Sequence, residues 1–362
     1  MRKCNVALDG HKEYTWAAAE TREGKIIEEG RIEHRPGAIR EYLKRFRKGS
    51  RVAVETTGSY YWIVDEIEEA GMVPLLVNAR KAKARLADEN HSDKLDVRGL
   101  LMLMAIGKLP TVWIPPTELR DLRELTRARM VFTNQRTRFK NRVHSALTKY
   151  GLLMNESNIF GSGARDGLRG IIAELPECHR FAASELLDYI DHFSEVIEQF
   201  DIRIKEKFKP VPEVELIDTL PGVGFTLAVV IWLEVGDISR FPLCDNLATY
   251  AGSTPRLNQS GKKKKHRCLG PVRRDVNQYL KWAYVEAANA VCSHRAQWPD
   301  RRVVRLYERT RRRKCHGKAA VAVARHLAES TYWILKKREA YRDQVERPSV
   351  SPQRTKVFVL KP

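Results

Sequence analysis

The first hundred residues alternate short apolar runs with polar turns. Three runs, CNVALD, TWAAAE and KIIEEGRIEH, follow one another with only turns between them, which predicts a three-strand meander. Two later runs, RVAVE and MVPLLV, predict buried strands, and the segments around them have helical spacing. The resulting order, β-β-β-α-β-α-β-α, predicts an α/β domain over residues 1–108, with a mixed sheet flanked by helices.

Residues 115–210 have the pattern of long helices. Thr117 follows two prolines and is expected to be the N-cap of the first of them. In the second, apolar residues recur at alternating spacings of four and three: Leu186, Ile190, Phe193, Ile197, Phe200 and Ile204. This heptad pattern predicts a coiled-coil region, in which the helix packs along either the 117–150 helix or a second copy of the protein.

Residues 211–342 predict a third, mostly helical unit. The segment DTLPGVGFTLAVVIWLEVGDISRF has the pattern of two helices joined by PGVG, and two further apolar segments predict more helices. The polar, proline-interrupted stretch 343–362 is expected to be a loose tail. The chain is thus expected to combine an α/β domain with all-α regions.

The charge and the cysteines restrict the partners. A formal net charge of +20 favours nucleic acid or an anionic membrane surface. No apolar run is long enough to span a bilayer, and the start of the chain has the pattern of a strand rather than a signal peptide, so no membrane is expected. The six cysteines form no close pairs, which fits a reducing cytosol and argues against zinc.

Four acids stand where strands and a helix would bring them together. Asp9 and Glu55 end two apolar runs, and Asp93 and Asp96 are three residues apart, hence on one helix face. Carboxylates from separate elements can hold Mg²⁺ or Mn²⁺, and two such ions activate a water or hydroxyl at a phosphodiester. As a set, the acids predict such a catalytic site. Singly, each could be a cap or turn residue, with Asp93 as an N-cap; His11 is expected at an exposed strand end.

Two basic segments predict contacts with nucleic acid. The cations are Arg127, Arg129, Arg136, Arg138, Lys140 and Arg142 in the first predicted long helix, and Lys262, Lys263, Lys264, Lys265, Arg267, Arg273 and Arg274 in the loop RLNQSGKKKKHRCLGPVRR. Such density would make binding strongly salt-dependent, although a solvated patch is the ordinary alternative. Gly222 and Gly224 of PGVG could bring backbone N–H groups to a phosphate, and a tight interhelical turn explains them equally well.

Ser260 opens the basic loop and is a candidate nucleophile. A serine attacks phosphorus only if its hydroxyl loses its proton and the charge that develops on the phosphate is balanced, and the neighbouring cations offer that balance. Ser253 and Thr254 are rival hydroxyls close by in the sequence.

Several segments together resemble the DEDD transposases of a bacterial and archaeal insertion-sequence family, the bridge recombinases, which are related to Piv-type DNA invertases. VALDGHK, AVETTGSYYW, LLVNARKAK and SDKLDVRGL resemble the family's RuvC-like, RNase H-fold domain, and place Asp9, Glu55, Asp93 and Asp96 at its metal-binding tetrad. TLPGVGFTLAVVIWLEVGDISRF and LATYAGSTPRLNQSGKKKKHR resemble its C-terminal transposase domain, and Ser260 matches the family serine. The family often has two glycines after this serine, whereas here Gly261 is followed by lysine.

The resemblance implies a function. It implies Mg²⁺-dependent cleavage and exchange of donor and target DNA, guided by a noncoding bridge RNA, in a homo-oligomer (dimer or tetramer) of the prokaryotic cytoplasm and nucleoid. It further implies that the serine cooperates with the metal site through a covalent link to DNA. The residues alone leave two alternatives: a metal-dependent junction-resolving nuclease that uses water, and a noncatalytic architectural protein that binds nucleic acid.

Overall fold

The computed structural model describes residues 4–86, 92–154, 156, 158–258, 268–272 and 275–343. The chain divides into two compact units, Met1–Pro115 and Pro116–Pro362. Within the described residues, no helix has both the length and the apolar character that crossing a membrane requires. The expected loose tail, 343–362, lies outside these residues except for Asp343.

The first unit is built on a five-stranded mixed sheet. Its strands are β1 (Asn5–Gly10), β2 (Tyr14–Glu20), β3 (Ile26–Glu33), β4 (Arg51–Glu55) and β5 (Val73–Val77), in the spatial order β3-β2-β1-β4-β5. The first three form the predicted antiparallel meander, and β4 pairs in parallel with both β1 and β5. Every residue of β1 is buried, as expected for a central strand covered on both faces.

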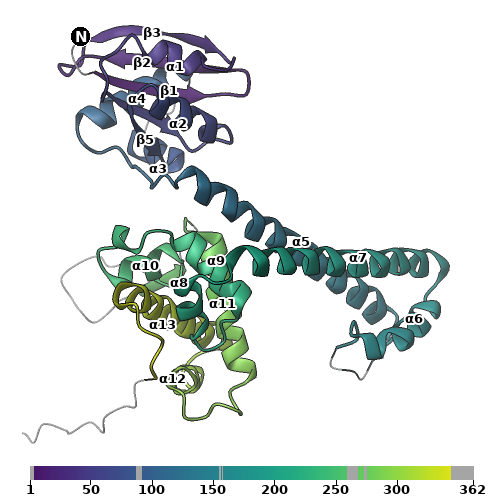
Figure 1. The fold of residues 1–362 in the computed structure, drawn as a ribbon. Helices are drawn as coiled ribbons and strands as arrows, with labels where there is room; N and C mark the ends of the chain where they lie inside the picture. The colour runs from purple at the N-terminus through teal and green to yellow at the C-terminus, as the bar shows by residue number, and fades with distance from the viewer. Residues whose placement is uncertain are drawn as a thin grey trace, which may run out of the picture. The chain divides into compact units, whose positions relative to one another are not determined.

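Helices cover both faces of this sheet (Figure 1). They are α1 (Ala38–Leu43), α2 (Tyr60–Glu69), α3 (Ala79–Leu86) and α4 (Asp93–Ala105). Val6 and Leu8 of β1 point into a core shared with α1 and α2, whereas Ala7 points into a core shared with α3 and α4. This alternation follows from the two-residue period of a strand. The predicted α/β arrangement is confirmed.

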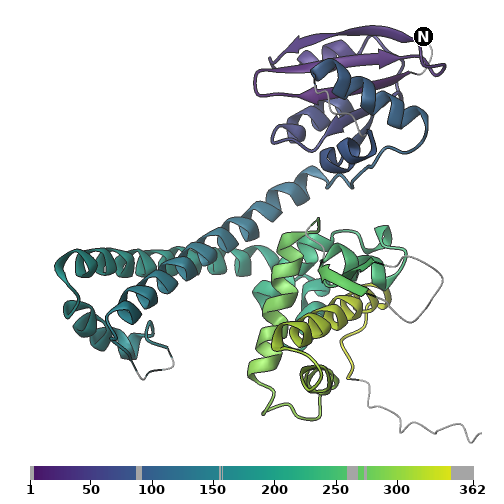
Figure 2. The same ribbon diagram turned by 180° about the vertical axis from the view of Figure 1, so that it is seen from behind.

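The second unit begins with a pair of long helices. Helix α5 (Thr117–Lys149) packs along α7 (Glu177–Phe208), and α6 (Arg165–Ala173) lies where α5 ends and α7 begins, as Figures 1 and 2 both show. Phe132 of α5 contacts Phe193 and Phe200 of α7. The heptad pattern of α7 therefore faces α5 of the same chain. The N-cap prediction for Thr117 is wrong: Thr117 is the first helical residue, and Pro116, with φ −52° and ψ 150°, holds the N-cap position.

The rest of the second unit is a helical core. Its elements are α8 (Pro212–Asp218), α9 (Phe225–Val235), α10 (Cys244–Tyr250), β6 (Pro255–Asn258), β7 (Cys268–Val272), α11 (Gln278–Ser293), α12 (Arg302–Arg311) and α13 (His316–Lys337). PGVG joins α8 to α9, as predicted. Gly222 has a positive φ of 77°, and a Cβ there would lie 2.3 Å from the carbonyl oxygen of Ala287 in α11. Glycine thus allows this turn to pack directly on the backbone of α11.

Candidate active site

Asp9 and Glu55 lie at one edge of the sheet. Because β1 and β4 are parallel and Leu8 pairs with Val54, the next residue on each strand is one of the two acids. The carboxyl ends of parallel strands meet at the same edge, so the sequence alone could place this pair. Both acids are largely buried, with 8% of each residue exposed.

Helix α4 brings the other two acids to the site. Ser92 is the N-cap of α4, and its hydroxyl accepts a hydrogen bond from the backbone N–H of Leu95. The alternative role of Asp93 as the N-cap is therefore wrong; Asp93 and Asp96 occupy the first turn. The hydroxyl of Tyr14 donates a hydrogen bond of 2.8 Å to Asp93 Oδ2, which holds the other carboxylate oxygen toward β1.

His11 lies between Asp9 and Asp93, although an exposed strand end was expected. Its Nε2 is 3.1 Å from Asp9 Oδ2 and 3.3 Å from Asp93 Oδ1, and its ring stacks on that of Tyr14 at 4.6 Å. The spacing D-x-H could have indicated this, because residues two apart in extended backbone point the same way.

The geometry fits a divalent cation. One ligand atom from each of Asp9, His11 and Asp93 lies within 4.8 Å of the other two, which suits ligands about 2.0–2.6 Å from a common ion. His11 Nε2 is buried, and its polar contacts in the described part of the chain are the two carboxylates of Asp9 and Asp93. Carboxylates and an imidazole together form a donor set suited to a divalent ion.

Electrostatics link all four acids. Burial raises the pKa of Asp9, and the negative charges of Asp96 and Asp93 raise it further, whereas His11 lowers it. Burial also raises the pKa of Glu55, with additional contributions from Asp9 and Asp96. Like charges held this close destabilise one another unless a cation compensates them.

The predicted serine loop can be located only by its borders. Ser260 and all seven cations of that loop, from Lys262 to Arg274, lie outside the described residues. Strands β6 and β7 on either side of 259–267 pair with each other, with Asn258 opposite Cys268. Of the rival hydroxyls, Ser253 is buried and donates a hydrogen bond of 2.8 Å to the carbonyl oxygen of Ala248.

The cations of α5 divide into two groups. Arg129 forms two hydrogen bonds of 2.8 Å with Asp201 of α7, and Arg136 donates to Ser194. Lys140 lies over the ring of Phe160 at 5.2 Å. In contrast, the side chains of Arg138 and Arg142 are exposed.

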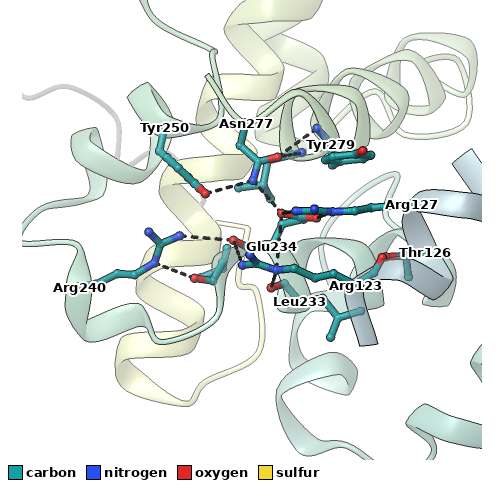
Figure 3. Close-up of polar contacts among 11 residues, drawn as sticks. Arg123, Thr126, Arg127, Leu233, Glu234, Arg240, Tyr250, Asn277 and Tyr279 are labelled. Carbon is teal, nitrogen blue, oxygen red and sulfur yellow. Dashed lines mark hydrogen bonds and ion pairs between the residues drawn. The ribbon is translucent and has the colours of Figure 1, made fainter. Parts of the chain in front are cut away.

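Arg127 joins a buried charge network that the sequence did not predict (Figure 3). The carboxylate of Glu234 on α9 is fully buried and accepts hydrogen bonds of 2.7 and 3.0 Å from Arg127. Asn277 donates to the same carboxylate at 2.8 Å and caps the start of α11. Arg123, also buried, donates to the carbonyl oxygens of Leu233 and Glu234. The network binds α5 to α9 and α11.

Comparison with protein families gives two matches. A DEDD-type IS110 transposase model matches residues 6–152, which contain Asp9, Glu55, Asp93 and Asp96. A model described as the transposase IS116/IS110/IS902 family matches residues 214–303, which contain Ser260 and Glu234.

Individual proteins are also similar to the chain. The transposase for insertion sequence element IS1111A of Coxiella burnetii is 25% identical over 261 residues, which cover 70% of this chain and 69% of that protein. The pilin gene-inverting protein of Moraxella bovis is 37% identical over 78 residues, 20% of this chain and 24% of that protein. A 44.8 kDa protein of insertion element IS116 of Streptomyces clavuligerus is 32% identical over 96 residues, 26% and 23% of the two chains.

Proposed function

We propose a reaction for this chain from the premise that it belongs to the IS116/IS110/IS902 family of transposases, with an N-terminal part of the DEDD type. Membership makes it a DNA transposase or recombinase and argues against a noncatalytic architectural protein. The site that we propose for strand cleavage and exchange consists of Asp9, Glu55, Asp93 and Asp96. The observation that supports it is the convergence of these acids from β1, β4 and α4 at one edge of the sheet.

The proposed cofactor is a pair of Mg²⁺ ions, which Mn²⁺ could replace. When bound, two such ions stabilise the attacking and leaving oxygens of a phosphodiester. The acids would hold them, and the crowding of buried carboxylates around Asp9 provides the charge that binding neutralises. We assign metal binding to the domain of residues 1–108 and the nucleophile to the domain of residues 211–342. The helical region 115–210 connects these two domains in the sequence.

We propose Ser260 as the nucleophile. Its Oγ would lose its proton and bond to phosphorus, while the bond from phosphorus to the leaving deoxyribose oxygen breaks and that oxygen gains a proton. Attack by a hydroxyl of the exchanged strand would reverse the step and release the serine. The proposed charge balance comes from the lysines at 262–265. Ser253 is a poorer candidate because its hydroxyl is buried and already donates to Ala248.

The partners follow the same proposal: donor DNA, target DNA and a noncoding guide RNA. Purifying the full chain from its own cells and sequencing the bound nucleic acid would test this. RNA transcribed next to the gene, with segments complementary to two DNA sites, is expected. Recovery of DNA alone, after nuclease-free purification, would remove the guide from the proposal.

Strand chemistry is then tested on a supercoiled plasmid that carries the recovered sites. Asp9→Asn and Ser260→Ala are each expected to abolish strand exchange, with Glu68→Gln and Ser253→Ala as matched controls at an exposed acid and a rival serine. A protein–DNA adduct that requires Ser260 supports the covalent step. If Ser260→Ala produces free cut ends without joined product, the water-dependent nuclease is favoured. If Asp9→Asn carries out full strand exchange, the acids are not the site of strand cleavage.

We also propose a dimer or tetramer. Helix α7 keeps large apolar side chains at its surface, namely Phe181, Tyr189 and Ile202, even though its heptad face packs on α5. Light scattering on the eluting protein, with and without the recovered RNA, measures the assembly. A monomer under both conditions would contradict this proposal.

A further inference from the structure

Helices α12 and α13 border an open cavity of about 460 Å³ that the metal site and the serine loop do not explain. Its lining residues are Arg302, Arg305, Leu306, Glu308, Arg309, Arg312, Arg313 and His326. Five of these eight residues carry a guanidinium group, which remains charged at any physiological pH.

The arginines line up because of helical spacing. Residues 302, 305, 309 and 312 recur every three or four positions, which places them on one side of α12. The opposite side carries Val303, Val304 and Tyr307, which are buried in the helical core. Packing of this apolar side thus fixes the arginine side toward the cavity.

Described acids leave four of these five arginines without an ion pair, all except Arg302, whose backbone N–H donates to Asp343. The one acid of the lining, Glu308, pairs with Arg295 at 3.5 Å, outside the cavity lining. Across the described ranges, Arg305, Arg309, Arg312 and Arg313 form no ion pair with an acid. The helix dipole favours cations only in the last turn of α12, so it gives no reason for Arg302 and Arg305 in the first turn.

We propose that this cavity binds consecutive phosphates of a nucleic-acid backbone. The ten residues of α12 extend about 15 Å at a rise of about 1.5 Å per residue. One strand of a duplex carries a phosphate about every 3.4 Å along the axis, so the row formed by Arg305, Arg309 and Arg312 is long enough to contact more than one phosphate. A single free phosphate would engage only part of this row. The kind of partner rests on the proposed function, whereas the site itself rests on the arginines.

The test is the salt dependence of binding by the full chain. A labelled DNA duplex of arbitrary sequence is titrated without divalent metal, and fluorescence anisotropy gives the affinity at several salt concentrations. Arg309→Gln is expected to reduce the slope of log affinity against log salt by about 0.9, the value for one duplex phosphate contact. The triple variant Arg305→Gln, Arg309→Gln, Arg312→Gln is expected to reduce it by about 2.7.

Arg311→Gln is the matched control on the same helix. Arg311 lies outside the cavity lining, over the ring of Tyr307 at 5.9 Å, and the charge change is the same. The slope is expected to be unchanged in this control. Circular dichroism melting of each variant separates lost binding from lost folding. Equal slopes for the wild type and a folded triple variant would overturn the proposal, as would equal losses from Arg309→Gln and Arg311→Gln.

Two further arms identify the occupant. Duplex RNA and DNA of the same sequence should both lose slope in the triple variant, because backbone phosphates carry no base information. Inorganic phosphate is added at constant ionic strength; if it abolishes the difference between wild type and triple variant, the cavity takes a free phosphate and the proposal is wrong. The binding assay contains no divalent metal and measures no strand cleavage, so its outcome is independent of whether the acids and Ser260 carry out the strand chemistry.

Discussion

The substitution Glu234→Gln tests the buried network directly. It keeps the shape of the side chain but removes the charge that accepts hydrogen bonds from Arg127 and Asn277. Arg123, with 5% of its side chain exposed and 3.7 Å from the carboxylate, would lose a fully buried counter-charge. Burial already lowers the pKa of Arg123, and Glu234 is the main group that opposes this effect.

The expected destabilisation is large. Removing one partner of a buried ion pair costs about 3–5 kcal/mol, because the remaining charge stays away from water without compensation. For a unit of this size, each kcal/mol lowers the melting temperature by about 2–4 °C. We therefore expect Glu234→Gln to lower the melting temperature of the second unit by roughly 6–20 °C.

Differential scanning calorimetry of the full chain measures this shift. The control is Glu206→Gln, which removes the same charge from an exposed pair with Arg203 at 3.5 Å. Exposed pairs contribute about 0–1 kcal/mol, so a shift below about 4 °C is expected for the control. If Glu234→Gln lowers the melting temperature by no more than the control does, Glu234 does not compensate the charge of the buried arginines. Combining it with Arg127→Gln should cost less than the sum of the two single changes.

Three other experiments test the site and the packing. Millimolar Mg²⁺ should raise the melting temperature of the wild-type first unit and raise that of Asp9→Asn less, because the buried carboxylates repel one another until a cation binds; equal shifts by calorimetry would contradict this. Burial holds the pKa of His326 below its unfolded value, so the stability that the neutral side chain contributes is complete above about pH 6.5 and is lost as pH falls further. The urea midpoint of His326→Gln should therefore vary less between neutral and mildly acidic pH than that of the wild type. Gly222→Ala should destabilise the chain by at least about 2 kcal/mol through a strained φ and a clash, whereas Gly224→Ala meets nothing within 4 Å and should be nearly neutral in the same urea titration.

The sequence predicted the elements whose patterns are local. Each strand of the first unit is an apolar run bounded by turn residues, and these runs became β1 to β5. The hairpin of β6 and β7 was missed, because PRLN and CLGPV are short, contain proline and lack alternation. Their pairing with each other depends on structural context, which a local sequence pattern does not report.

The sequence allows the pairing of two of the acids to be predicted, but not the contacts of the buried Glu234 network. Asp9 and Glu55 could be paired from the sequence because each lies near the carboxyl end of a strand. Neighbouring parallel strands have these ends at the same edge of the sheet. Glu234 is separated from Arg127 by more than a hundred positions and has no periodic relation to it, so only the packing of α5 on α9 reveals their contact. One local signal exists: Glu234 is the only acid in an otherwise apolar helix.

The basic character of α5 therefore has two physical meanings. Arg127 binds Glu234 and lies 4.5 Å over the ring of Tyr279 at the start of α11, just after Asn277, so it holds α5 to the segment that follows β7. Its charge is neutralised inside the protein and is not offered to a phosphate. The same holds for Arg129, which forms an ion pair with Asp201. Counting arginines along a helix thus overstates its affinity for nucleic acid wherever contacts within the fold neutralise them. Arg305, Arg309 and Arg312 differ because no described acid forms an ion pair with them.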